Sequence, residues 1–183
     1  MTRGFSRPAR IALLTSTGFS LDQLFPGAFP DAGERRVSGL AFDSRKVTPG
    51  YAFVALAGAK ADGARFITDA IQRGAAAIVS SAERPADLPS GIAYAQVADP
   101  RLALALAAAT VHPRQPGTVV AVTGTSGKSS VAEFTRQIFM ALGRKAASVG
   151  TIGIVTEAGA DYGSLTTPDP LSLHASLDRL AGD

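Results

Sequence analysis

Ten residues from Ala121 to Ser130, AVTGTSGKSS, combine the residue types that bind phosphate groups. Two glycines, a lysine and two serines follow one another closely after the apolar run Thr118–Val120. Gly124 and Gly127 let backbone amides converge on an anion because no Cβ stands in the way, and the start of a helix adds partial positive charge. A lysine ammonium suits the β- and γ-phosphates, and a serine hydroxyl can ligate Mg²⁺. The stretch therefore predicts a nucleotide-binding loop.

One position departs from the general phosphate-loop pattern, G-x-x-x-x-G-K-[ST]. Five residues before Gly127 the sequence has Val122, where the pattern has its first glycine. The alternative interpretation is a glycine turn that only joins a strand to a helix. The apolar run before the loop and the helical pattern after it favour nucleotide binding, because that is the setting in which phosphate loops occur.

The elements around this loop must hold it in place. Residues 118–123 are expected to form a buried strand, and a helix is expected from about Lys128 to Leu142, ended by Gly143. Residues 146–154 predict a strand and a turn, and Asp169-Pro170 is expected to begin a last helix over residues 171–180. The apolar stripe of the first of these helices consists of Val131, Phe134, Ile138 and Leu142.

The first half of the chain alternates strand and helix patterns. Ser20, with Gln23 three residues later, is the capping-box signature of a short helix. The apolar run 51–58 predicts a buried strand, the segment from Asp62 to Gly74 a helix, and the run AAAIVSS a second strand. This order predicts a right-handed parallel crossover. The residues expected to share the buried face of that helix are Phe66, Ala70 and Ile71.

A second strand–helix pair leads to a predicted linker in the middle of the chain. The run 92–97 predicts a strand, and the next helix is expected to be capped by Asp99 and to begin at Pro100. Residues 112–117, HPRQPG, contain two prolines and a glycine and interrupt every periodic pattern. We therefore expect two domains, 1–112 and 117–183. The fold class is α/β, with a small α/β domain followed by the start of a Rossmann-like phosphate-loop domain.

The composition excludes several function classes. Apolar residues make up 46% of the chain and charged residues 18%, as in a globular protein, and cysteine is absent, which excludes disulfides and thiol chemistry. The net charge is +3 without a basic run of five residues, so no nucleic-acid surface is expected. The longest apolar stretch, residues 102–111, is about half of the roughly 20 residues that a membrane helix needs. We expect a soluble, cytoplasmic protein of undetermined oligomeric state.

Three stretches resemble the Mur ligase family. TGTSGKSS, residues 123–130, lacks the usual first glycine and resembles the ATP loop of that family. Residues 43–79, from DSRK to AAIV, resemble the uridine-nucleotide-binding domain of two of its members, MurE and MurF. GTIG at 150–153, followed by LTTPDPLSLH at 165–174, favours the MurE type over MurF. The resemblance extends from about Val37 to the C-terminus, with the motifs in the family's order.

The resemblance implies roles for individual residues. The ATP-binding residues would be Gly124, Thr125, Ser126, Gly127, Lys128, Ser129 and Ser130, with Lys128 as the catalytic residue and Ser129 as the Mg²⁺ ligand. The residues that bind UDP-MurNAc-L-Ala-D-Glu would be Ser44, Ala59, Lys60, Ala61, Thr166 and Thr167. Without the resemblance, Asp43-Ser44-Arg45 favours a simpler interpretation, a turn with a local ion pair between Asp43 and Arg45.

The implied reaction is ATP-dependent amide-bond formation in peptidoglycan precursor synthesis. ATP would phosphorylate the γ-carboxylate of the D-Glu, and a diamino acid, meso-diaminopimelate or lysine, would attack the acyl phosphate. The segment after Gly117 is short for a doubly wound nucleotide domain, so we expect an incomplete piece that is inactive alone. Two alternatives are a non-enzymatic nucleotide or UDP-sugar binding module and another P-loop NTPase or kinase.

Overall fold

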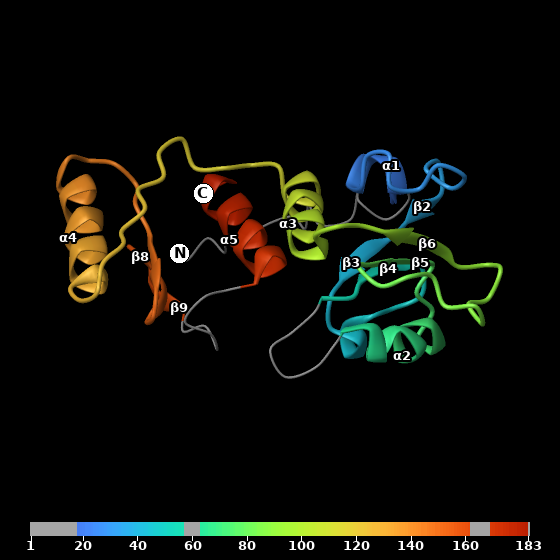
Figure 1. The fold of residues 1–183 in the computed structure, drawn as a ribbon. Coiled ribbons are helices and arrows are strands. Elements are labelled where there is room, and N and C mark those ends of the chain that lie inside the picture. The colour runs from blue at the N-terminus through green and yellow to red at the C-terminus, as the bar shows by residue number, and fades with distance from the viewer. Residues whose placement is uncertain (1–17, 57–62, 162–168, 183) are drawn as a thin grey trace, which may run out of the picture. The chain divides into compact units, whose positions relative to one another are not determined.

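The computed structural model describes residues 18–56, 63–161 and 169–182, and the chain divides into two compact units. The first unit extends to Val111 and the second begins at His112, within the proline-containing segment. Each unit has its own sheet and helices (Figure 1).

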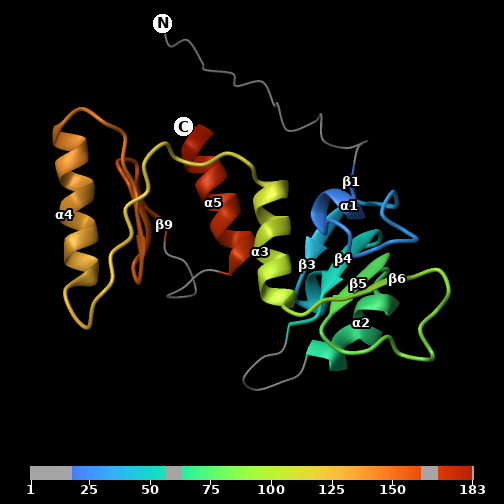
Figure 2. The same cartoon turned by 45° about the horizontal axis from the view of Figure 1, so that its top comes forward.

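The first unit contains a four-stranded parallel sheet in the order β3-β4-β5-β6. These strands span Gly39–Ala41, Tyr51–Val54, Ala77–Ser80 and Ala93–Gln96. The helix α2, Ile67–Gln72, lies on one face of the sheet, and α1, Leu21–Leu24, lies with α3, Pro100–Val111, on the other (Figures 1 and 2). The predicted parallel crossover between β4 and β5 is confirmed. Before β3 in the chain, β1 (Phe19–Ser20) and β2 (Arg36–Val37) form a separate, short antiparallel sheet.

The core of the first unit follows from the alternation of side chains along its strands. Phe53 of β4 is paired with Ile78 of β5 and faces α2, where Ile67 and Ala70 pack against them. Leu104 on α3 is fully buried, with 0% of its surface exposed. Both faces of a parallel sheet are normally covered by helices, and the apolar runs of these strands reflect that burial.

Local capping residues act as the sequence predicts. The Ser20 hydroxyl accepts a hydrogen bond from the backbone of Gln23, and the Gln23 side chain accepts one from the backbone of Ser20 in return. Asp99 Oδ1 accepts hydrogen bonds from the amides of Arg101 and Leu102, at 2.9 and 3.0 Å, so it caps α3. These caps satisfy amide groups that a helix start otherwise leaves without partners.

The start of α2 differs from the prediction. A 3-10 helix, Gly63–Phe66, precedes the α-helix, and Phe66 is 45% exposed instead of sharing the buried face of Ala70. A 3-10 turn rotates successive side chains by a larger angle than an α-helix does. The prediction that Phe66 lies on the buried face with Ala70 is therefore wrong. Asp62, expected to cap this helix, lies outside the described residues.

The second unit contains two longer helices and an antiparallel sheet in the order β7-β8-β9. The helices are α4, Lys128–Ala141, and α5, Pro170–Gly182. The strands span Ser148–Gly150, Gly153–Thr156 and Gly159–Asp161. Gly143, at a φ of +74°, follows α4 and ends it, because its amide bonds the carbonyl of Met140 and the next amide, of Arg144, bonds that of Phe139.

The beginning of the second unit is hydrogen bonded to α5. The backbone amide of Arg114 donates to Asp178 Oδ1 at 2.9 Å, and its guanidinium donates to both carboxylate oxygens at 3.1 and 3.0 Å. These contacts lower the pKa of Asp178, chiefly through the hydrogen bond from the Arg114 side chain. Asp169 caps α5 by accepting from the amide of Ser172 at 2.9 Å, as expected for the Asp-Pro start.

The strand expected at 118–123 is absent from this structure, in which those residues carry no regular secondary structure. Val119 and Val120 are 66% and 56% exposed, and no strand within the described residues of the second unit pairs with them. A central strand needs neighbours on both sides to satisfy its backbone groups, so the apolar run alone does not make one.

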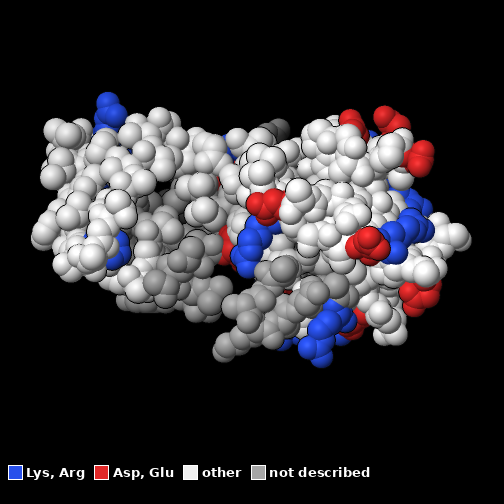
Figure 3. Space-filling model, in the orientation of Figure 1, with Lys and Arg blue, Asp and Glu red and all other residues white. Residues whose placement is uncertain are grey.

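The apolar stripe on α4 is exposed as well, with Phe134 at 61%. The surface around α4 shows few charges in the view of Figure 3.

Candidate functional site

The glycine-rich loop of the second unit leads directly into α4. Gly127 is the N-cap of this helix at φ +77° and ψ −4°, a left-handed conformation that glycine adopts at low cost. Gly124 also has a positive φ, +146°. The first helical hydrogen bond runs from the amide of Val131 to the carbonyl of Gly127, at 2.9 Å. Both glycines therefore have the backbone conformations that their residue type allows.

The amide groups of the first turn of α4 have no side-chain cap among the described residues. The N–H groups of Lys128, Ser129 and Ser130 precede the first helical hydrogen bond, so they have no acceptor within the helix. An anion placed before the helix would accept these donors and interact favourably with the positive end of the helix dipole. The backbone thus provides the donors that a phosphate group requires.

Lys128 folds back over the loop that precedes it. Its Nζ donates to the carbonyl of Gly124 at 2.5 Å and lies 3.4 Å from the carbonyl of Thr125. This ammonium therefore stands beside the same loop whose amides are available for an anion. A lysine in this position adds a full positive charge to the partial charge of the helix start.

Ser129 contacts the turn between β7 and β8. Its Oγ lies 3.2 Å from Oγ1 of Thr151, and both side chains are exposed. The sequence pattern singled out Ser129 as a candidate but gave no indication of this partner, because the two residues are far apart along the chain and share no motif.

The described residues fit an Mg²⁺ ion that is carried by a nucleotide. They contain no group of three or more His, Asp or Glu side chains that could hold a metal ion. Mg²⁺ in nucleotide sites is often bound through one or two protein oxygens together with phosphate oxygens and waters. The Ser129 hydroxyl, on the first turn after the loop, could supply an oxygen of that kind.

An ion-pair network joins α4 to β7 next to this loop. Arg136 donates to both oxygens of Glu133, and Ser148 of β7 donates to Glu133 Oε2 at 3.2 Å. The hydrogen bonds from Arg136 and then Gln137 are the largest causes that lower the pKa of Glu133 from 4.5 to about 2. Glu133 is therefore ionised at neutral pH and holds the strand against the helix.

Ser44, expected to bind the UDP-sugar, lies in the first unit just after the carboxyl end of β3. It belongs to a 3-10 turn, Ser44–Lys46, and only 5% of its surface is exposed. Its hydroxyl is hydrogen bonded to Asp69 of α2 and is the largest cause of the lowered pKa of that carboxylate. The carboxyl ends of parallel strands are where α/β folds place ligands, so this location suits a binding residue.

The local ion pair expected beside Ser44 is present. Asp43 Oδ1 accepts from the amide of Arg45 at 3.1 Å, and the Arg45 guanidinium lies 2.7 Å from Asp43 Oδ2. The side-chain hydrogen bond from Arg45 lowers the pKa of Asp43. The remaining residues expected to bind the UDP-sugar, Ala59, Lys60, Ala61, Thr166 and Thr167, lie outside the described residues.

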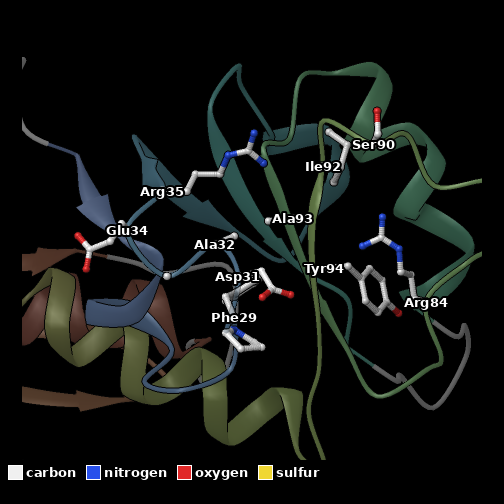
Figure 4. Close-up of a pocket in the computed structure, with 12 residues that line it drawn as sticks. Phe29, Asp31, Ala32, Glu34, Arg35, Arg84, Ser90, Ile92, Ala93 and Tyr94 are labelled. Carbon is white, nitrogen blue, oxygen red and sulfur yellow. The ribbon is translucent and has the colours of Figure 1, made fainter.

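A cavity of about 660 Å³ in the first unit was not expected from the sequence. It is lined by the loop Phe29–Arg35, by Arg84 and Ser90, and by residues 92–94 at the start of β6. Figure 4 shows the loop on one side of the cavity and Arg84 with Tyr94 on the other. The Arg35 guanidinium already donates to the carbonyls of Ala76 and Gly91, at 3.2 and 2.7 Å. The cavity lies at the amino end of β6, whereas Ser44 follows a carboxyl end.

Two family profiles match the chain, and together they cover most of both units. The profile described as "Mur ligase family, catalytic domain" matches residues 36–113, and that of the "Mur ligase middle domain" matches residues 122–183.

Among the helices of the described residues, none has both the length and the apolar composition that a membrane span requires.

Two similar relatives carry the same enzyme name. The chain is 54% identical over 154 residues to the UDP-N-acetylmuramoyl-L-alanyl-D-glutamate--2,6-diaminopimelate ligase of Bradyrhizobium diazoefficiens, covering 83% of this chain and 31% of that protein. It is 52% identical over 153 residues to the protein of the same name in Rhizobium meliloti, covering 84% of this chain and 31% of the relative. The chain therefore spans about a third of the length of these relatives.

Solved structures show the same fold. A UDP-N-acetylmuramoyl-L-alanyl-D-glutamate--2,6-diaminopimelate ligase superposes with a TM-score of 0.71 at 23% identity, over 90% of this chain and 34% of that one. A MurF structure from Acinetobacter baumannii gives a TM-score of 0.51 at 29% identity, over 69% of this chain and 28% of that one. The α/β class expected from the sequence is thereby confirmed.

Proposed function

Because the chain belongs to the Mur ligase family, we propose that it forms the nucleotide-sugar-binding and ATP-binding part of a MurE-type ligase. In this proposal the first unit binds UDP-MurNAc-L-Ala-D-Glu and the second binds Mg-ATP. The whole enzyme would join a diamino acid, diaminopimelate by analogy with the named relatives, to the substrate in the cytoplasm, where ATP is available. The matched region spans about a third of each relative, so binding is the property that we assign to the residues of this chain.

The observation that carries this proposal is the geometry of the loop before α4. Gly127 stands in a left-handed conformation at the N-cap, the amides that follow it are uncapped within the described residues, and Lys128 lies over the loop. Together these groups provide several N–H donors and a full positive charge within one turn of helix. Such a set suits the terminal phosphates of a nucleotide better than it suits a neutral ligand.

In the proposed reaction ATP supplies the phosphoryl group that activates the γ-carboxylate of the substrate's D-Glu. Lys128 would neutralise charge that develops on the transferred group, and the α4 amides would hold the phosphates in line with the carboxylate. Ser129 would place its hydroxyl oxygen toward the cation that accompanies the phosphates. Ser44 would contact the UDP-sugar at the carboxyl edge of the first sheet.

Calorimetric titration of the 183-residue chain tests both binding assignments. We expect saturable binding of UDP-MurNAc-L-Ala-D-Glu and, separately, of Mg-ADP. Lys128→Ala should weaken Mg-ADP binding about 10- to 100-fold, the effect of losing a charge-assisted hydrogen bond of about 1.5–3 kcal/mol. Lys145→Ala is the matched control, since Lys145 follows the opposite end of α4, about 20 Å away by helical rise.

The outcomes separate the alternatives. Nucleotide binding without any binding of the UDP-sugar would reduce the assignment to a bare phosphate-loop protein. Equal affinities for Mg-ADP in the wild type and in Lys128→Ala would show that Lys128 and its loop do not bind the nucleotide.

A further inference from the structure

The turn between β7 and β8 is held beside the nucleotide loop by contacts with one face of α4. Ser148 of β7 donates to Glu133, and Thr151 in the turn lies 3.2 Å from Ser129, oxygen to oxygen. Ser129 and Glu133 are four residues apart, so they occupy the same side of the helix. The strand therefore runs along this side and delivers Thr151 to the end of the helix where the loop begins.

Two sets of contacts fix the position of this turn: the pairing of β7 with β8, and the contact of β7 with α4. Gly150 of β7 and Gly153 of β8 are partners in the antiparallel register, so only two residues separate the strands. At the other end of β7, Glu133 is ionised at neutral pH and is also bonded to Arg136, with a pKa lowered to about 2. The position of the Thr151 hydroxyl is consequently set by a hairpin and by a helix contact.

The chemistry of a serine ligand requires a partner for its hydrogen. A hydroxyl group has one hydrogen to donate and lone pairs to offer. When its oxygen faces a cation, its hydrogen must point away from the cation and toward an acceptor. Thr151 Oγ1 is at hydrogen-bonding distance from Ser129 Oγ, and either oxygen can donate in the structure itself.

We propose that Thr151 is a positioning residue of the nucleotide site: its Oγ1 accepts the hydrogen of the Ser129 hydroxyl and thereby directs the Ser129 oxygen at the cation of a bound Mg-nucleotide. The inference rests on the proposed function, because it takes Ser129 as the cation ligand. Thr151 acts through Ser129 and needs no contact of its own with the nucleotide.

The test compares nucleotide binding with and without Mg²⁺. Thr151→Val keeps the size and branching of the side chain but removes the hydroxyl, and Thr151→Ser restores it. Thr156→Val is the matched control, because the Thr156 hydroxyl lies in the same hairpin, where it donates to the carbonyl of Gly159 at 3.2 Å. Each variant of the 183-residue chain is titrated with ADP in excess Mg²⁺ and again in a chelator, after its far-ultraviolet circular dichroism is matched to the wild type.

Thr151→Val should weaken binding of Mg-ADP about tenfold, the effect of one hydrogen bond to a charged site, and leave binding of metal-free ADP unchanged. Thr151→Ser and Thr156→Val should bind both forms as the wild type does. An equal loss of both forms in Thr151→Val would identify a purely structural role and overturn the proposal, as would unchanged Mg-ADP binding. If the wild type binds neither ADP nor Mg-ADP, the proposed nucleotide-binding function itself is wrong, and the role of Thr151 that depends on it is wrong as well.

Discussion

Replacing Gly127 by alanine tests whether the loop depends on a backbone conformation or on open space. Gly127 has φ +77°, and a Cβ added there would meet no atom within 4 Å from beyond the adjoining residues. Steric conflict with residues elsewhere in the protein therefore does not oppose the substitution. What opposes it is the left-handed conformation, which costs an alanine about 1–2 kcal/mol relative to right-handed backbone.

This conformational cost sets the expected size of the effect. If the loop must be left-handed at this residue to align its amides, about 1–2 kcal/mol translates into roughly a 5- to 30-fold loss of Mg-ADP affinity. Asparagine tolerates the left-handed region better than alanine does, so Gly127→Asn should recover most of the affinity. The order of affinities should be glycine, then asparagine, then alanine.

Calorimetry on the three proteins measures these affinities, with Gly117→Ala as the control. Gly117 also has open space around it, but its φ is not in the positive range, so alanine there should leave the affinity unchanged. Wild-type affinity in Gly127→Ala would refute the requirement for left-handed backbone. Asparagine as harmful as alanine would show instead that any Cβ at this position strikes the bound phosphates.

Three further predictions concern stability. Leu104→Ala removes a fully buried side chain and should destabilise the first unit by about 2–5 kcal/mol, measured by urea denaturation with tyrosine fluorescence. Asp99→Ala removes the cap of α3 and should cost about 1 kcal/mol in the same assay, whereas Asp87→Ala, at an exposed loop position, should cost little. The pKa of Glu133 is lowered from 4.5 to about 2, so its contacts should stabilise the second unit above pH 4.5 and lose that effect as the pH falls through about 2. Glu133→Gln should remove this part of the acid transition seen by circular dichroism.

The features predicted correctly from the sequence are those decided within a few residues. The caps at Ser20, Asp99 and Asp169 and the glycine end of α4 depend on a side chain or a φ value next to the helix terminus. Their hydrogen-bond partners lie at most five residues away, so the local sequence contains the whole interaction.

The features that the sequence did not predict depend on distant partners. Val119 and Val120 have the composition of a strand, but a strand exists only where another strand pairs with it. The contact between Ser129 and Thr151 joins residues 22 positions apart, and the cavity beside Arg35 joins a loop to the start of β6. The residues that we propose to bind nucleotide were selected from their types alone, whereas their surroundings required the fold.

The pairing of Arg114 with Asp178 has a consequence for hydrogen exchange. The amide of Arg114 lies outside every helix and strand, yet it donates to a carboxylate of α5 at 2.9 Å. Such an amide exchanges with solvent deuterium when its acceptor moves away, either by rotation of the Asp178 side chain or by opening of α5, so its protection measures how firmly this contact with α5 is held. A single backbone position near the unit boundary thus reports the docking of a helix 64 residues further along the chain.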